Sequence, residues 1–237
     1  MPEATAPHFA DRRAAGRLLA ARLRDAPMGP PVQGRGAVPE AWPAVGNGPL
    51  VLALPRGGVA IAREVADLLA APLDVLVTRK IGYPYQPELG VGAIAEGGEP
   101  VYDEVLLARL GLSRSALGPV ADRERAELDR RVKVYRGGRP PPDVAGRQVI
   151  LVDDGLATGV TARAALRSLR ARSAGWTVLA VPVAAPASAA AMLPEADGVV
   201  ALLMPTAFRA VGEWYVSFGQ LTDSDVLKLL DRDRYAG

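Results

Sequence analysis

The residues of this chain that are best placed to do chemistry stand together in residues 149–161, VILVDDGLATGVT. Apolar residues lead directly into two adjacent aspartates, Asp153 and Asp154, and a turn containing Gly155 and Gly159 follows. Glycines permit positive φ angles that point successive backbone N–H groups inward, so this turn, placed before a helix, suits a phosphate. The paired carboxylates suit the hydroxyls of a sugar because they only accept hydrogen bonds.

Two other polar segments follow short apolar runs in the same way. Pro-Arg-Gly-Gly at residues 55–58 comes after the apolar residues 50–54, and Arg79-Lys80 comes after the predicted strand 73–78. Ligands of open α/β sheets bind outside the carboxyl ends of the strands. We therefore expect all three segments to converge on one crevice.

Each segment also has a purely structural interpretation. One aspartate could cap the following helix or pair with a nearby arginine, residues 55–58 could be a tight connection with a solvated Arg56, and Arg79-Lys80 could be a solvated strand edge. The loop after Asp154 lacks the lysine of GxxxxGK[ST] and is not GxGxxG. The expected convergence of the three segments favours the functional interpretation.

The elements that must position these residues alternate along the chain. Short apolar runs alternate with helical patterns, which predicts an α/β fold with a doubly wound parallel sheet of about five strands and flanking helices. Residues 26–49 are crowded with glycine and proline and read as a flexible insertion, and residues 81–98 read as irregular. The predicted strands are 50–54, 73–78, 149–152, 177–183 and 198–204. The predicted helices are 9–23, 59–69, 162–172, 187–193 and 223–230, the last capped by Thr222 or Asp223, and residues 101–130 are expected to be mostly helical.

The run VILVDDGLATGVT resembles the binding motif for 5-phosphoribosyl-1-pyrophosphate (PRPP) of the type I phosphoribosyltransferases, with four apolar residues, two acids, a short spacer and Thr-Gly-x-Thr. The order of the other segments resembles that family from residue 50 to about residue 203. The resemblance implies a single domain over residues 1–237, with a smaller hood over the site. Hood elements are expected at about 81–147 and 205–237.

The resemblance also implies roles for individual residues. Asp153 and Asp154 would bind the ribose 3′- and 2′-hydroxyls. Arg56, Gly57 and Gly58 resemble the pyrophosphate loop, in which a non-proline cis peptide is common in the family, and Arg79 and Lys80 resemble the cationic pair that meets pyrophosphate. The residues that would cradle the 5′-phosphate are Ala157, Thr158, Gly159, Val160 and Thr161.

The activity implied is transfer of the phosphoribosyl group from Mg-PRPP to a nitrogen heterocycle such as a nucleobase, with release of pyrophosphate. Mg²⁺ would bridge substrate oxygens with few or no direct protein ligands, so no metal-binding residue is assigned. The alternative is a noncatalytic PRPP- or nucleotide-binding regulator of the same fold. Such a regulator should carry a DNA-binding domain, and the predicted helix 9–23 is too little for one. A hydrolase of the α/β type is disfavoured because no GxSxG occurs.

Composition excludes several other classes. The chain has no cysteine and one histidine, His8, which excludes disulfides and thiol nucleophiles and disfavours structural zinc. A formal net charge of +2 over 237 residues gives no reason to expect a nucleic-acid partner. No signal-peptide pattern and no apolar run of about 18 residues is present, so we expect no membrane contact and a cytoplasmic location. Dimers are common among related proteins, which suggests a homodimer.

Acceptor recognition is the least defined part of the sequence. The late aromatic cluster in residues 208–220 contains Trp214, Tyr215 and Phe218, and either Trp214 or Tyr215 could stack on an acceptor base. The alternative is that this cluster packs the tail helix onto the core. The charged stretch 113–136 reads as a solvated helix of the hood or of a subunit contact.

Overall fold

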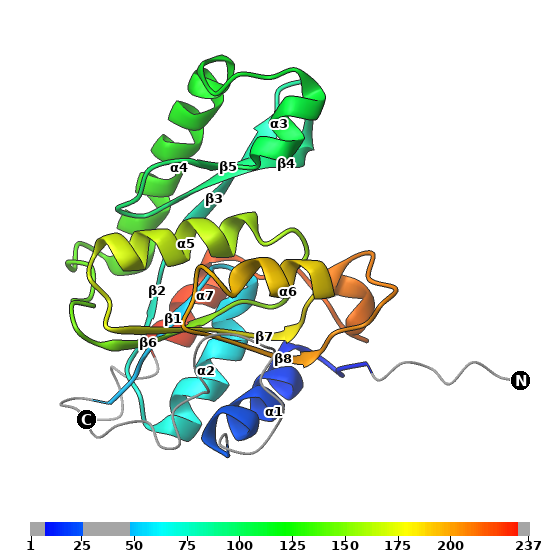
Figure 1. The fold of residues 1–237 in the computed structure, drawn as a ribbon. Helices are drawn as coiled ribbons and strands as arrows, with labels where there is room; N and C mark the ends of the chain where they lie inside the picture. Colours follow the sequence, from blue (N-terminus) through cyan, green and yellow to red (C-terminus); the bar gives the residue numbers. More distant parts are fainter. Residues whose placement is uncertain (1–7, 26–47, 232–237) are drawn as a thin grey trace, which may run out of the picture.

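A computed structural model of the chain describes residues 8–25 and 48–231. Its main sheet has five parallel strands in the order β2-β1-β6-β7-β8 (Figure 1). The prediction of a doubly wound α/β fold with five parallel strands is confirmed. The strands are β1 (Leu50–Ala53), β2 (Leu73–Val75), β6 (Gln148–Val152), β7 (Trp176–Val183) and β8 (Gly198–Leu203).

Helices cover both faces of this sheet (Figure 1). On one face lie α1 (Arg12–Arg24), α2 (Gly57–Leu69) and α7 (Asp223–Leu230), and on the other lie α5 (Val160–Ala171) and α6 (Pro186–Met192). The strands are apolar along nearly their whole length because both of their faces are buried, with all four residues of β1 fully covered. The chain reverses its winding between β1 and β6, since β1 leads through α2 to β2 and β6 leads through α5 to β7.

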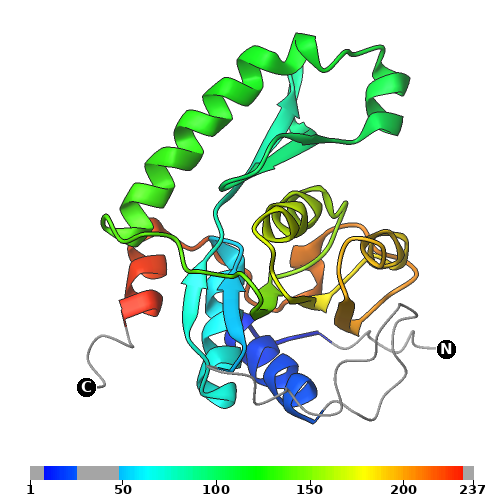
Figure 2. The same ribbon diagram turned by 60° about the vertical axis from the view of Figure 1, so that its left-hand side comes forward.

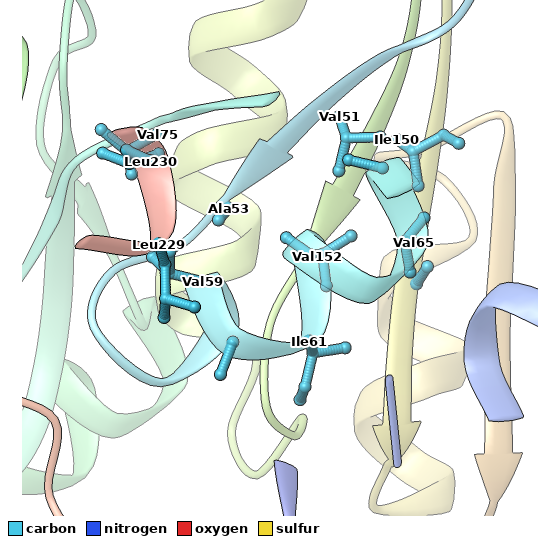
Figure 3. Close-up of a cluster of buried hydrophobic side chains, with 14 of the residues drawn as sticks. Val51, Ala53, Val59, Ile61, Val65, Val75, Ile150, Val152, Leu229 and Leu230 are labelled. Carbon is cyan, nitrogen blue, oxygen red and sulfur yellow. The ribbon is translucent and has the colours of Figure 1, made fainter. Parts of the chain in front are cut away.

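The core beneath β1 and β6 holds these two strands together (Figure 3). Val51 of β1 and Ile150 of β6 are fully buried and pack against Ile61 and Val65 of α2. Full burial of an aliphatic side chain contributes roughly 1.5–3 kcal/mol. The two strand ends that carry the candidate site are therefore anchored by the largest hydrophobic cluster in the described structure.

A second, smaller unit stands beside the sheet and forms the hood (Figure 2). It consists of an antiparallel sheet in the order β3-β4-β5 with helices packed on it. The hood elements are β3 (Thr78–Tyr83), β4 (Gln86–Ala95), β5 (Val101–Tyr102), α3 (Glu104–Leu110), the 3₁₀ turn η1 (Ser115–Leu117) and α4 (Gly118–Arg136).

The prediction that residues 81–98 are irregular is wrong, because most of them belong to β3 and β4. Their glycines lie where backbones approach closely: a Cβ at Gly82 would stand 2.4 Å from the Pro87 carbonyl oxygen, and one at Gly92 would stand 2.8 Å from the Val101 carbonyl oxygen. The register also shifts between Ile81 and Tyr83. Glycine at close contacts and a β-bulge hide the alternation by which strands are recognised.

The described part of residues 205–237 packs on the main sheet and its helices. Phe9 pairs with Tyr215 in a β-bridge, and both rings join Trp214 and Val183 in one buried cluster beside the 3₁₀ turn η2 (Val211–Trp214). The predicted cap of α7 is confirmed at Thr222, in a capping box with Asp225. Residues 26–47 of the predicted insertion lie outside the described residues.

Within residues 8–25 and 48–231, no helix combines the length and the apolarity that spanning a membrane requires.

Candidate functional site

A cleft of about 620 Å³ separates the carboxyl ends of β1 and β6 from the hood. Its sheet side is formed by the loop after β1 and the loop after β6, and its hood side is formed by β3, the β3–β4 turn and α4. The position is the point where the winding of the sheet reverses, which is where open α/β sheets bind ligands. The lining residues are Leu54–Gly57, Thr78–Lys80, Gly82–Pro84, Pro87, Glu88, Val120, Arg123, Glu124, Arg131, Asp153–Gly159, Thr161 and Val211.

The loops after β1 and β6 touch each other across the floor of the cleft. The Leu54 N–H donates to the Val152 carbonyl at 2.8 Å, which extends the pairing of the two strands. A Cβ at Gly58 would lie 2.6 Å from the same carbonyl oxygen, so the loop can approach this closely only with glycine there. The expected convergence of residues 55–58 and 153–161 is present in the structure.

The peptide bond between Pro55 and Arg56 is cis, as the family resemblance implied. Arg56 is partly exposed at the cleft, and its Nη1 lies 3.8 Å from Asp223 Oδ1 at the start of α7. Gly57 lines the cleft directly beneath Asp154.

Asp153 and Asp154 both line the cleft, but they have different partners. Asp153 Oδ1 accepts a hydrogen bond from the Asp154 N–H at 2.8 Å. Burial raises the pKa of Asp153 well above its ordinary value, and the charge of Asp154 acts in the same direction, while that backbone hydrogen bond and Lys80 oppose the rise. A buried carboxyl next to another carboxylate is a typical feature of functional sites.

Asp154 forms an ion pair with Arg12, the first residue of α1. Arg12 Nη2 lies 2.8 Å from Asp154 Oδ2. Burial raises the pKa of Asp154, and Arg12 opposes that rise. Pairing with an arginine was the structural alternative for one of the two acids, and for Asp154 the structure shows it. Both aspartates nonetheless border the cleft, so the pairing does not withdraw Asp154 from it.

The turn after the aspartates leads into α5 through Gly159, which has φ of +76° and precedes the first helical residue. Ala157 and Thr158 are exposed on the cleft, and Thr161 also lines it from the first turn of α5. The side chain of Val160 is buried in the core, so only its backbone could meet a ligand. The Ser188 hydroxyl of α6 donates to the Ala157 carbonyl, which fixes the turn from behind.

Arg79 and Lys80 were expected at the end of the second strand of the main sheet, and that placement is wrong. They lie inside β3, the first strand of the hood, because β2 ends earlier, at Val75. Both line the cleft. Arg79 is paired with Glu124 of α4 at 2.7 Å, whereas Lys80 forms no ion pair with any described residue.

The late aromatic residues do not face the cleft. Trp214 and Tyr215 are 8% and 5% exposed, and they pack with Phe9 rather than against α7. The Tyr215 hydroxyl donates to the backbone carbonyl of Asp154 at 2.6 Å, so this cluster supports the cleft from beneath. Tyr83 of the hood is the aromatic residue that lines the cleft within the described chain.

Sequence reasoning missed several residues that border or support the cleft. Arg12 approaches from α1, Val211 from η2, and Arg123 and Arg131 from α4. The charged pattern of residues 113–136 predicted a solvated hood helix, and that helix also presents arginines to the cleft. Nothing local to Arg12 marks it in the sequence, because its partner follows it by 142 positions.

The comparisons with known proteins agree with this geometry. Residues 44–193 match the family described as "Phosphoribosyl transferase domain". Two proteins from two strains of Mycobacterium tuberculosis, named "Putative phosphoribosyl transferase" Rv0571c and MT0597, are each 43% identical to this chain over 224 residues. These residues are 94% of this chain and 46% of each relative. The chain thus spans about half the length of these curated relatives.

A solved structure of similar size has the same fold. The crystal structure of TT1426 from Thermus thermophilus superposes with a TM-score of 0.71 at 42% sequence identity, covering 94% of this chain and 97% of that one. The matched residues 44–193 include both loops of the cleft floor and all of the hood elements. The chain belongs to the phosphoribosyltransferase domain family.

Proposed function

We propose that this domain transfers the 5-phosphoribosyl group of PRPP to a nitrogen atom of a heterocyclic acceptor, with a nucleobase as the first class to test. The observation that carries the proposal is the cleft floor. There, two largely buried carboxylates and a glycine-containing turn at a helix N-terminus lie against a second strand-end loop. These groups match the hydroxyls and the phosphate of one ribose 5-phosphate.

Asp153 and Asp154 would accept hydrogen bonds from the ribose 3′- and 2′-hydroxyls. The 5′-phosphate would be bound by backbone N–H groups of Ala157–Thr161 and by the hydroxyls of Thr158 and Thr161. The N-terminus of α5 provides a favourable electrostatic environment for that dianion, since N–H groups and the positive end of the helix dipole meet there. The substrate would be oriented with its anomeric carbon toward the hood.

In the reaction, a bond forms between the acceptor nitrogen and the anomeric carbon while the bond from that carbon to pyrophosphate oxygen breaks. Pyrophosphate leaves with the electron pair, and the proton of the acceptor nitrogen passes to the leaving pyrophosphate or to solvent. Lys80 and Arg56 would stabilise the charge that grows on pyrophosphate, together with Arg79. Catalysis of this kind depends on positioning and charge placement and needs no covalent nucleophile.

Within the described chain, no three His, Cys, Asp or Glu side chains gather in an arrangement that could hold a metal ion. Mg²⁺ would enter with the oxygens of PRPP, and Asp153 and Asp154 would hold the ribose hydroxyls. When bound, Mg²⁺ would neutralise pyrophosphate charge. The hood would limit access of water, which otherwise consumes PRPP by hydrolysis.

The test is pyrophosphate release from Mg-PRPP in the presence of a panel of purine, pyrimidine and other nitrogen heterocycles, with PRPP binding measured in parallel by calorimetry. We expect base-dependent release for at least one acceptor. The double variant Asp153→Asn/Asp154→Asn should lose both binding and turnover while its thermal unfolding stays cooperative. Normal turnover by that variant would refute the ribose assignment, and PRPP binding without release for any acceptor would favour a noncatalytic binding protein.

A further inference from the structure

Arg12 is the described residue outside the cleft lining that makes the most direct contact with the cleft chemistry. Its Nε donates to Asp154 Oδ2 at 2.9 Å, and its Nη2 lies 2.8 Å from the same oxygen. The side chain of Arg12 is only 11% exposed, and that of Asp154 is 17% exposed. The ion pair is therefore largely shielded from solvent. A shielded ion pair constrains the geometry of its two side chains more strongly than one on the surface does.

The same oxygen of Asp154 also lies close to Gly57. A Cβ placed on Gly57 would stand 1.8 Å from Oδ2 and 3.2 Å from Oδ1. Both contacts of Arg12 with this carboxylate end on Oδ2 and neither on Oδ1. The carboxylate is thus held by one oxygen, and the other is left available to a ligand in the cleft.

Arg12 itself is fixed by two further contacts. Its Nη1 donates to the Gly219 carbonyl at 2.7 Å, and its guanidinium carbon lies 3.8 Å above the centre of the Phe218 ring. The nearby Tyr215 hydroxyl holds the Asp154 carbonyl. The first turn of α1 and residues 215–219 therefore meet at the aspartate that follows β6.

We propose that Arg12 is a positioning residue of the ribose site, which holds Asp154 so that Oδ1 faces the ribose hydroxyl. The inference rests on the proposed function. In that role Arg12 also supplies a positive charge that offsets the repulsion between two adjacent, largely buried carboxylates before the sugar binds. It never touches the reacting atoms, and its effect passes through Asp154.

The competing explanation is that Arg12 only fastens residues 218 and 219 to α1. A double-mutant cycle on PRPP binding separates the two, using Arg12→Met, Asp154→Ala and the double variant. The Asp154→Ala background removes the carboxylate but neither Gly219 nor Phe218, so any cost of Arg12→Met in that background measures fastening. Arg13→Met is the matched control because Arg13 is the next residue of α1 and is exposed.

We expect Arg12→Met to weaken PRPP binding about tenfold in the wild-type background, corresponding to about 1.4 kcal/mol, and to have almost no effect in the Asp154→Ala background. Arg12→Lys should recover part of the loss, since a single ammonium restores charge but not the paired donors. Arg13→Met should bind as wild type does.

Two results would overturn the inference while leaving the proposed function standing. One is wild-type PRPP affinity in Arg12→Met. The other is an equal loss in both backgrounds, which would assign Arg12 to fastening. A wild-type protein that binds no PRPP would overturn the proposed function and this inference together. Thermal midpoints measured for each variant show whether a loss of binding reflects a loss of folding.

Discussion

The two walls of the cleft are built on different principles. The sheet wall is set by the backbone: Gly57 and Gly58 admit close contacts with Asp154 and Val152, and Gly159 turns the chain into α5. The hood wall is set by long charged side chains on partly exposed surfaces, such as the pair of Arg79 and Glu124 at 27% and 23% exposure. One wall is therefore rigid and preorganised, whereas the other depends on contacts that each contribute little.

This difference suggests a division of work. Preorganised donors suit the part of a substrate that stays the same in every reaction, which in the proposal is ribose 5-phosphate. Adjustable side chains suit the acceptor, which is the part that can differ between reactions, whereas the leaving pyrophosphate would meet both walls, through Arg56 on the sheet side and through Arg79 and Lys80 on the hood side. The hood nevertheless must be anchored to the main sheet if its side chains are to reach the cleft.

The anchor is Arg136 at the end of α4, and this residue is 1% exposed. Its guanidinium forms an ion pair with Glu96, donates to the Val75 carbonyl at 2.8 Å and lies 3.7 Å from Asp74. Replacing one partner of a buried ion pair leaves the other charge uncompensated. We expect Arg136→Met to lower the free energy of unfolding by about 3–5 kcal/mol, measured by urea denaturation.

The control for this prediction is Arg130→Met on the same helix, where the arginine is 53% exposed and pairs with Glu127. An exposed pair contributes at most about 1 kcal/mol, so this variant should unfold close to wild type. Equal losses of unfolding free energy in both variants would mean that the buried contacts of Arg136 anchor the hood no more firmly than an exposed ion pair does.

The sheet wall is tested most directly at Gly57. Because a Cβ there would collide with Asp154 Oδ2, Gly57→Ala must displace the carboxylate or the loop. We expect PRPP affinity to fall about 100-fold, equivalent to about 2.7 kcal/mol, with little change in the thermal midpoint. Gly118→Ala at the start of α4 is the control, since nothing lies within 4 Å of its added Cβ. Retained affinity in Gly57→Ala would show that the sheet wall is not rigid.

The sequence predicts the sheet wall better than the hood wall, for a physical reason. Residues 149–161 combine an apolar strand, paired acids and a glycine turn within one local stretch. Each part can therefore be recognised from the residues next to it in the sequence. The hairpin of β3 and β4 is hidden because Gly82 and Gly92 serve contacts with distant backbone rather than local alternation. Arg12 cannot be assigned from sequence, since its role is defined only when α1 meets the loop after β6.

Asp153 provides a pH-dependent test of the sheet wall. Its pKa in the folded protein is raised by burial and by Asp154, whereas an unfolded aspartate titrates near about 3.9. The folded state therefore holds this proton more tightly. The associated stability is present below about pH 3.9 and is lost as the pH rises through the folded pKa, by about 1.4 kcal/mol for each unit of difference.

Asn does not titrate, so Asp153→Asn avoids this loss. We expect its thermal midpoint to exceed that of wild type at about pH 8, with a smaller difference at about pH 4. Asp122→Asn, on the exposed face of α4, is the control and should change the midpoint little at either pH. A midpoint difference that is the same at both pH values would show that the carboxylate is not destabilised by its position.

The smallest effect is expected on the hood wall, at Glu124. This carboxylate holds Arg79 through contacts of 2.7 Å from both Nε and Nη2, and Glu124→Gln would free the guanidinium for anions in the cleft. We expect PRPP to bind up to about threefold more tightly at low ionic strength, with the gain lost near 1 M salt because partly exposed charges are screened. Calorimetry at the two salt concentrations measures the effect, with Glu104→Gln as the control because Glu104 pairs with Arg114 away from this cleft. An affinity gain that persists at high salt would mean that Glu124 shapes the hood wall by packing, which would make that wall as rigid as the sheet wall.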